Sequence, residues 1–210
     1  MAKASRDLGI VVTGGVVERD ATTEGGERLY NAMPVYDGGA LRGVYRKTHL
    51  SRVLGVTSES DVFAAGDAPL NVEVQSPSAP RRRLRVGLAC CFDLRFPGFL
   101  AAYAGRVDVL CAPSAFLDVT GRDHWELLAR RTALDAQAYV VAPNVAYDAA
   151  DAVPLHGHSM LVDPWGRVLA SCSANGDDLA IADLDTDLID DVRSKLPIGP
   201  LARWAFHKIP

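Results

Sequence analysis

Short apolar runs rich in β-branched residues, each closed by turn residues, most strongly constrain what this chain can fold into. Three stand out along the sequence: Gly9 to Val17, Leu84 to Cys91 and Val107 to Pro113. Continuous apolar runs of this length are typical of strands buried on both faces. Gly98 to Gly105, between the second and third runs, is rich in Leu, Ala and Tyr, which predicts a short crossover in a strand, helix, strand unit.

The stretch from Asp123 to Ala138 is the clearest predicted helix, because its apolar residues recur at helical spacing with charged residues between them. The residues after it predict four short strands bounded by Pro, Gly, Asn or Asp: Tyr139 to Val145, Ser159 to Asp163, Val168 to Cys172 and Leu179 to Leu184. Asp185 to Lys195 predicts a final helix that ends before Pro197. This order of elements predicts an α/β fold.

Length and charge restrict the classes of protein to consider. A chain of 210 residues with 49% hydrophobic content can bury one substantial core, so we expect a single domain over residues 1–210. A net charge of −4 gives no basic field for a phosphate backbone, which argues against a nucleic-acid partner. The one basic run, Arg81 to Arg83 with Arg85, follows Pro- and Ser-rich residues and fits a solvated turn tip better than a binding patch.

The first residues and the cysteines indicate a compartment. The start of the chain is charged where a secretory signal needs apolar residues, and no segment approaches the roughly 18 apolar residues of a membrane span. The four cysteines show no C-x-x-C pair or framework spacing, which predicts reduced thiols: Cys90, Cys91, Cys111 and Cys172. We therefore expect a cytoplasmic protein, or alternatively a mitochondrial one, without a membrane partner.

Cys91 is the strongest candidate nucleophile. It closes an apolar run and precedes Phe92 to Pro97, so it should lie where a strand ends and a turn or helix begins. Such a position exposes a side chain and points backbone N–H groups towards whatever the thiol attacks. Cys90 and Cys91 would equally fit a pair of small buried hydrophobic residues. Strand alternation, however, lets only one of the two point into the core.

Weaker signals surround a lysine and several histidines. Strand alternation turns Tyr45, Lys47 and His49 to one face, and an inward lysine needs a partner, although a solvated edge strand explains the pattern better. His124-Trp125-Glu126 opens the predicted helix and places a carboxylate in its first turn, where a capping role is a sufficient explanation. His156-Gly157-His158 has no third ligand at metal-binding spacing, so we do not expect a zinc site.

In their order along the chain, these segments resemble the nitrilase superfamily of carbon-nitrogen hydrolases. Four strings carry the resemblance: Tyr45 to Leu50 looks like the lysine motif, Cys91 to Pro97 looks like the nucleophile motif, and His124 to Leu128 and Gly157 to Gly166 repeat two further signatures. Their wording is most similar to the omega-amidases and the deaminated-glutathione amidases, which hydrolyse the side-chain amide of small 2-oxo acids or of a related peptide.

The resemblance implies a role for each of several residues. Cys91 would attack the amide carbon and form a thioester that water hydrolyses, while Lys47 and the backbone N–H of Phe92 would stabilise the oxyanion. Glu59 would help to position Lys47, and Glu126 would support the site without transferring protons. No cofactor or metal is implied, because a thiolate, an ammonium group and a carboxylate suffice for amide hydrolysis.

The resemblance leaves the substrate open between the two amidase groups. Thr57 to Ser60, leading to Asp67, leans towards the omega-amidases, and Pro113 to Phe116 leans towards the deaminated-glutathione amidases. Either group implies a small-molecule amide that carries a carboxylate. The resemblance further implies a homo-oligomer, a dimer or larger, paired through the helices that flank the sheets.

The implied fold is an α-β-β-α sandwich of two sheets flanked by helices, here lacking its N-terminal strands and first helix. In the family, the glutamate that deprotonates the thiol precedes anything that resembles Gly9 to Val17. Glu18 does not fit that role, because its stretch matches a different part of the family sequence. A catalytically silent homologue, acting as a binding or dimerisation module, is therefore the alternative to an amidase. A sheet without its first strands should also expose apolar surface and an unpaired edge.

Overall fold

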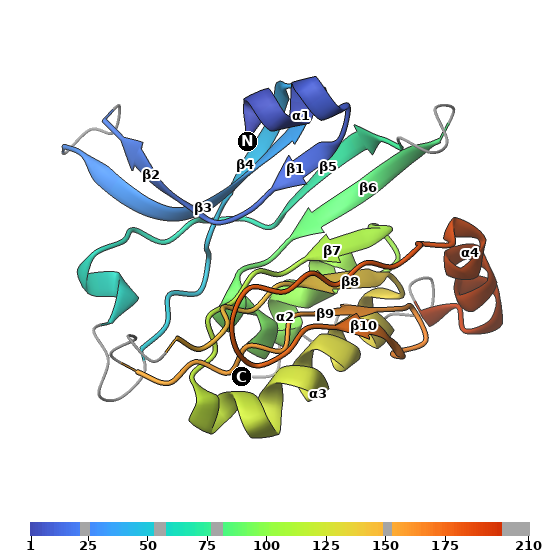
Figure 1. Cartoon of the computed structure of the whole chain (residues 1–210). Coiled ribbons are helices and arrows are strands. Elements are labelled where there is room, and N and C mark those ends of the chain that lie inside the picture. The colour runs from blue at the N-terminus through green and yellow to red at the C-terminus, as the bar shows by residue number, and fades with distance from the viewer. Residues whose placement is uncertain (22–25, 53–57, 77–81, 149–152, 199–210) are drawn as a thin grey trace, which may run out of the picture.

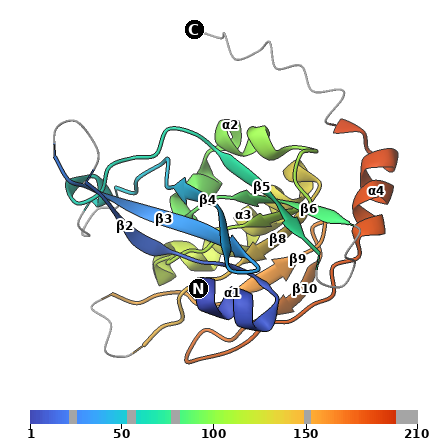
Figure 2. The ribbon, with the colours of Figure 1, turned by 90° about the horizontal axis from the view of Figure 1, so that it is seen from above.

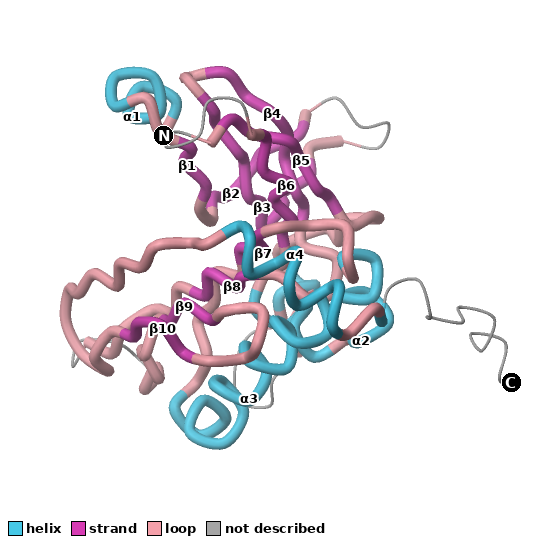
Figure 3. The backbone as a smooth tube through the Cα atoms, turned by 90° about the vertical axis from the view of Figure 1, so that its right-hand side faces the viewer, coloured by secondary structure: helices cyan, strands magenta, loops and turns pink. Residues whose placement is uncertain are grey.

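Two β-sheets form the structure, with helices on their outer sides and the last helix at one end of the second sheet (Figure 1). The computed structural model describes residues 1–21, 26–52, 58–76, 82–148 and 153–198. Helix α1 (Ala2–Leu8) packs on the first sheet, whereas α3 (Asp118–Ala136) packs on the second. Figure 3 shows α2 (Pro97–Leu100) and α3 on the far side of the second sheet from the first. The predicted α/β fold with two sheets and flanking helices is confirmed.

The first sheet is antiparallel and is built around one long strand. Its members are β1 (Val11–Thr13), β2 (Val16–Asp20), β3 (Arg28–Asp37) and β4 (Ala40–Arg46). β4 pairs with one side of β3, and β1 and β2 follow each other along the other side in one register. The hydrogen-bond ladder between these strands and β3 is interrupted at Gly14 and Gly15. In the same register Gly14 lies opposite Pro34, which has no amide N–H to donate, and Gly15 lies opposite Met33.

The predicted strand at Gly9 to Val17 is confirmed in place, but its burial on both faces is wrong. Val17 is 65% exposed, and the residues of β1 are half-buried. Within the described residues, β1 and β2 pair with β3 alone, so they form an edge of the sheet. This agrees with the expectation of an unpaired edge and exposed apolar surface.

The second sheet is mixed and has the order β10-β9-β8-β7-β6-β5. Its strands are β5 (Leu70–Gln75), β6 (Arg83–Leu88), β7 (Val109–Cys111), β8 (Tyr139–Ala142), β9 (Met160–Val162) and β10 (Val168–Ser171). β6, β7 and β8 run parallel, and the crossover from β6 to β7 contains α2 and a 3₁₀ turn at Ala101–Tyr103. The predicted strand, helix, strand unit is therefore confirmed.

Helix α3 begins earlier than its periodicity predicts. It starts at Asp118, so His124 to Glu126 lies beyond its first turn, and the expectation that this stretch opens the helix is wrong. The missed first turn contains Gly121, where an added Cβ would lie 2.2 Å from the His156 ring. Gly121 is required by its contact with a distant residue, and a glycine does not contribute to the apolar periodicity from which the helix was predicted, so the first turn was missed. Among the described residues, no helix is long and apolar enough to cross a membrane.

The segment after β10 is extended but pairs with no strand in the described part of the chain, so the strand predicted at Leu179 to Leu184 is wrong. Half-buried side chains alternate along it with Leu179 and Ile181, which are 77% and 75% exposed. This alternation of half-buried and exposed side chains is typical of a strand, but a strand also needs a neighbouring strand with which to form hydrogen bonds. Helix α4 (Thr186–Lys195) follows as predicted, and the Asp185 side chain caps it by accepting a hydrogen bond from Asp187 N at 2.9 Å.

The basic run is not a free turn tip. Arg85 lies within β6 and forms an ion pair of 2.7 Å with Asp108, so this part of the expectation is wrong. Arg82 lies near carboxylates of α4 at 3.6 and 3.7 Å, and Figure 2 shows α4 at that end of β6. Arg81 lies outside the described residues.

The core has two main layers. One lies between the sheets and joins residues of β3, β4, β5 and β6: Met33, Val35, Tyr45, Val72, Val74, Val86 and Leu88. The other lies between the second sheet and α3, where Trp125 is fully buried. Cys90 belongs to the first layer, and Cys91 packs against both. The two cysteines therefore stand where the layers meet, at the carboxyl end of β6.

Candidate active site

Cys91 occupies a sharp turn directly after a buried strand. β6 ends at Leu88, and Cys91 begins the 3₁₀ turn Cys91–Arg95. Its φ is 49°, in the left-handed region that residues other than glycine rarely adopt, and its N–H donates to Pro113 O at 3.0 Å. Strained backbone of this kind clusters at functional sites. Cys90 is 6% exposed and Cys91 is half-buried, so only the first thiol lies in the core.

Two of the other thiols, those of Cys90 and Cys111, are poorly suited to attack. Burial raises the pKa of Cys90 to about 12, and its Sγ lies 3.9 Å from Asn31 Oδ1. Burial also raises the pKa of Cys111 to about 12. All four cysteines are free. Because the thiolate is the nucleophile, burial disqualifies Cys90 and Cys111.

Lys47 follows β4 and is 2% exposed, so a solvated edge strand does not explain it. Its Nζ lies 2.5 Å from Glu59 Oε2. Burial alone would lower the pKa of Lys47, but its electrostatic interactions with Cys90, Cys91 and Glu59 and its hydrogen bond to Glu59 together outweigh burial, and the pKa is raised. The buried lysine is therefore held as an ammonium group within electrostatic reach of Cys91.

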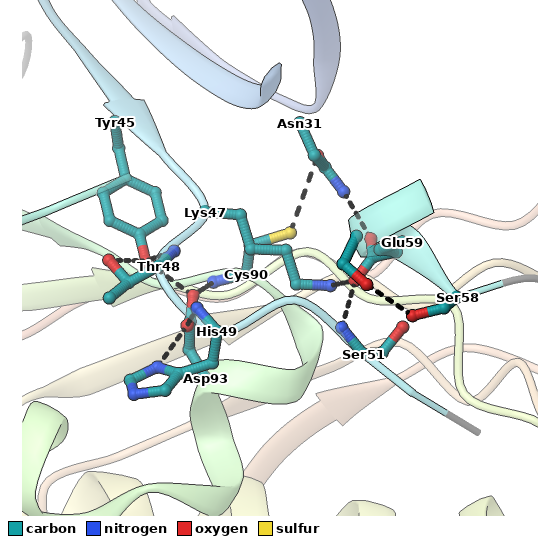
Figure 4. Close-up of polar contacts among 11 residues, drawn as sticks. Asn31, Tyr45, Lys47, Thr48, His49, Ser51, Ser58, Glu59, Cys90 and Asp93 are labelled. Carbon is teal, nitrogen blue, oxygen red and sulfur yellow. Dashed lines mark hydrogen bonds and ion pairs between the residues drawn. The ribbon is translucent and has the colours of Figure 1, made fainter. Parts of the chain in front are cut away.

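Glu59 begins the 3₁₀ turn Glu59–Asp61 and holds Lys47 in place (Figure 4). Its carboxylate also accepts hydrogen bonds from Ser51 N at 2.6 Å and Asn31 Nδ2 at 3.1 Å. Burial would raise the pKa of Glu59, but the bonds from Lys47 and Ser51 outweigh it, and the pKa is lowered. A carboxylate this firmly ionised and occupied is suited to positioning rather than to accepting a proton.

A cavity of about 480 Å³ opens beside Cys91. Its lining is Ser51, Arg52, Cys91, Phe92, Arg95, Ala115, Phe116, Leu117 and Thr120. Neither arginine forms an ion pair within the described residues. The Arg95 guanidinium lies 5.1 Å from the centre of the Phe116 ring and 3.1 Å from His124 Nδ1. Two guanidinium groups without carboxylate partners, set against apolar walls, are suited to an anionic ligand.

The structure brings four of the five expected site residues together. Lys47 and Glu59 form the buried pair, and Cys91 and Phe92 line the cavity. The Phe92 N–H has no acceptor in the described part of the chain. Glu126 lies elsewhere, because its side chain is 59% exposed on α3 and pairs with Arg130 at 3.0 Å.

Other candidates have structural partners. The Glu18 carboxylate accepts two hydrogen bonds from Arg46, at 2.7 and 2.8 Å, which leaves it engaged on the other side of β4 from Lys47. His156 lies 3.5 Å from an Asp118 carboxylate oxygen, and the residues described contain no group of three side chains that could hold a metal ion. Two polar residues, the half-buried Asn31 and the fully buried Asp93, carry no signal in the sequence because each acts through partners far away in the chain.

Comparison with known proteins decides the family. The model of the carbon-nitrogen hydrolases matches residues 1–194. The chain belongs to the carbon-nitrogen hydrolase family. It is 38% identical over 205 residues to the deaminated glutathione amidase of Rattus norvegicus, covering 94% of this chain and 60% of that protein. It is 32% identical to the chloroplastic omega-amidase of Arabidopsis thaliana, covering 100% of this chain and 55% of that protein.

Solved structures agree with this assignment. The crystal structure of Saccharomyces cerevisiae Nit3, a member of branch 10 of the nitrilase superfamily, matches with a TM-score of 0.81 and 28% identity, covering 97% of this chain and 69% of that one. The Caenorhabditis elegans NitFhit protein matches with a TM-score of 0.81 and 31% identity, covering 99% of this chain and 50% of that one. The resemblance to the nitrilase superfamily is confirmed, and the chain spans about 60% of the length of the rat relative.

Proposed function

We propose that this chain carries the nucleophile and oxyanion groups of an amidase that hydrolyses small carboxylate amides. The observation that carries the proposal is the position of Cys91, which lines a cavity from a strained turn within electrostatic reach of the buried Lys47 ammonium. Membership of the carbon-nitrogen hydrolase family supports the reaction class.

The chemistry follows from these positions. The Cys91 thiolate attacks the amide carbon, and negative charge develops on the carbonyl oxygen. Lys47 and the Phe92 N–H stabilise that charge, and fixed donors of this kind contribute about 3 to 4 kcal/mol each to transition-state stabilisation. Collapse of the tetrahedral intermediate breaks the C–N bond, which releases the amine and leaves a Cys91 thioester. Water then hydrolyses the thioester to a carboxylic acid and the free thiol.

Proton transfer needs a carboxylate that is free to accept a proton. The Glu59 carboxylate is occupied by Lys47, and that of Glu18 is occupied by Arg46. In the family, a separate glutamate performs this step, and general base catalysis is worth about 10²- to 10⁴-fold. The proposal therefore assigns thiol attack and oxyanion stabilisation to these residues and predicts efficient turnover only where such a carboxylate is supplied.

The cavity favours an anionic amide. Arg52 and Arg95 supply two guanidinium groups beside Cys91, and Phe116 supplies an apolar wall. Relatives of both amidase types are similar to this chain, the rat deaminated glutathione amidase and the Arabidopsis omega-amidase. We therefore propose that the substrate of this chain is an amide whose acyl group carries a carboxylate, and the proposal covers both amidase types.

Two accompanying features belong to the same proposal. Helix α3 exposes Val119, Leu127 and Leu134, which recur every seven or eight residues, and this stripe is suited to pairing with a second copy. The four free thiols fit a reducing compartment, in agreement with the expected cytoplasmic location.

A catalytically silent binding or dimerisation module remains the second candidate. The observation that favours it is that the two carboxylates considered above are both engaged in ion pairs. Ammonia release from small 2-oxo-acid amides by the purified chain tests this second candidate. Release above background would reject the silent module.

A trapping experiment tests the nucleophile independently of turnover. An amide-like electrophile should acylate the wild-type chain and the Cys90→Ser variant, but not the Cys91→Ser variant. Cys90→Ser is the matched control, because it removes the neighbouring thiol and leaves the proposed nucleophile. Acylation that survives Cys91→Ser would sink the assignment.

A further inference from the structure

A second buried carboxylate connects the segments that carry the lysine and the nucleophile. Asp93 has no exposed surface and lies two residues after Cys91 (Figure 4). Its Oδ2 accepts hydrogen bonds from the Tyr45 hydroxyl at 2.6 Å and from Cys90 N at 2.8 Å. Its Oδ1 accepts a hydrogen bond from His49 N at 2.9 Å and lies 2.8 Å from His49 Nδ1. One carboxylate thus meets four polar atoms from two distant segments.

The partners of Asp93 flank both reactive residues. Tyr45 and His49 stand two residues before and two residues after Lys47. Cys90 directly precedes Cys91 in the same turn as Asp93. A rigid bridge between these flanking residues therefore determines how far the lysine segment lies from the nucleophile turn.

Aromatic contacts reinforce the bridge. The His49 ring stacks on Phe96 with ring centres 3.7 Å apart and planes 9° apart, and the edge of Phe99 packs at 5.2 Å. Burial and the Asp93 carboxylate raise the pKa of Tyr45, so its hydroxyl stays protonated and donates. Burying a carboxylate is costly unless its oxygens are satisfied, and four partners satisfy this one.

We propose that Asp93 is a positioning residue that locks the Lys47 segment to the Cys91 turn and so sets the separation between the ammonium group and the thiol. Asp93 acts through Tyr45, His49 and Cys90 and touches neither the substrate nor the reacting atoms. This inference rests on the proposed function. Without the bridge, Lys47 keeps its Glu59 partner but loses its fixed place relative to Cys91.

Two substitutions loosen the bridge without burying an unpaired charge. Tyr45→Phe removes one donor to Oδ2. His49→Phe keeps an aromatic ring to stack on Phe96 and removes the Nδ1 contact. Asp93→Asn is the stronger change, and this variant is included in the experiment if thermal unfolding shows that it folds.

A matched control exists elsewhere in the core. Tyr103→Phe removes another buried hydroxyl, which bonds to Leu88 O and to Leu70 N and does not touch Asp93. It should cost similar stability while it leaves the bridge intact.

The measurement is the rate of Cys91 alkylation by iodoacetamide against pH on the full chain, read by mass spectrometry of the Cys91 peptide, with thermal unfolding as the check on folding. A nearby ammonium group favours the thiolate, so Tyr45→Phe and His49→Phe should move the profile of alkylation rate against pH to higher pH. At a fixed pH on the rising part of the profile, each pH unit of this shift lowers the rate about tenfold. Tyr103→Phe should leave the profile in place.

An unmoved profile in both bridge variants, or an equal shift in Tyr103→Phe, would overturn the proposal. Alkylation needs no amide turnover, so failure of the proposed function would be seen separately as absent ammonia release. Where turnover is measurable, the bridge variants should lower kcat more than they change KM, because the oxyanion donor is displaced while the cavity is kept.

Discussion

Replacing Glu59 with glutamine tests how strongly the buried lysine depends on its partner. Lys47 is 2% exposed and its side chain bonds to a carboxylate that is 18% exposed. Removing one partner of a buried ion pair costs about 3 to 5 kcal/mol, because the other charge is left uncompensated. A glutamine keeps one carbonyl oxygen for Lys47 and Ser51, but its NH₂ group would face the Asn31 NH₂. We therefore expect Glu59→Gln to lower the free energy of unfolding by about 2 to 3 kcal/mol.

The assay is urea unfolding at neutral pH for Glu59→Gln, Lys47→Met and the double variant. The double variant should be more stable than the sum of the single effects predicts, with a coupling of at least about 1 kcal/mol. Glu126→Gln is the control, because it breaks the exposed Glu126–Arg130 pair and should cost less than about 0.5 kcal/mol. Equal and small effects of Glu59→Gln and Glu126→Gln would refute the reasoning.

The sign of the pH dependence follows from the same pair. The pKa of Glu59 is lowered, so its contribution to stability is complete above the ordinary value of 4.5 and is lost as pH falls through the folded-state pKa. The pKa of Lys47 is raised, so its contribution is complete below 10.5 and is lost as pH rises through the folded-state pKa. Glu59→Gln should flatten the acid limb of the stability profile, and an unchanged acid limb would contradict this account.

Three further changes test the cavity, helix α3 and helix α4. Succinate bound in the cavity should slow the alkylation of Cys91 by iodoacetamide. Arg95→Gln should raise the succinate concentration needed for this protection about tenfold, because one charge-assisted contact is lost. Undiminished protection would contradict an anion site there. Gly121→Ala should lower the free energy of unfolding by about 1 to 3 kcal/mol in urea, because its Cβ would meet the His156 ring. Asp108→Asn should increase proteolysis of α4, because Asp108 bonds to Arg193, and unchanged cleavage kinetics would count against that link.

Elements whose signal lies within a few consecutive residues were predictable from the sequence, and elements that depend on a distant partner were not. The strand at Leu84 to Cys91, the crossover and most of α3 follow from apolar runs and helical spacing over a few residues. The strand predicted at Leu179 to Leu184 had the right alternation and failed, because pairing depends on a neighbour that alternation does not reveal. The interruption between β1 and β2 depends likewise on a partner strand that carries Pro34.

The site divides in the same way. Cys91 and Lys47 were singled out by their place in apolar and alternating runs and then by motifs that resemble a family, whereas Glu59 was found through the resemblance alone. Glu126 was found through the same wording, yet it lies on the exposed side of α3, because the helix begins at Asp118 and turns that carboxylate away from the cavity.

The sequence by itself determined the fold class, the strand end at which Cys91 lies and the family to which the chain belongs. Only the tertiary structure decided that Asp93 joins Tyr45 to Cys90, that Asn31 supports Glu59 and that Arg52 and Arg95 line the same cavity as Cys91. The physical reason is distance along the chain. Hydrogen bonds between residues 28 or 48 positions apart form only once the sheets have packed, and they leave no periodic pattern in the sequence.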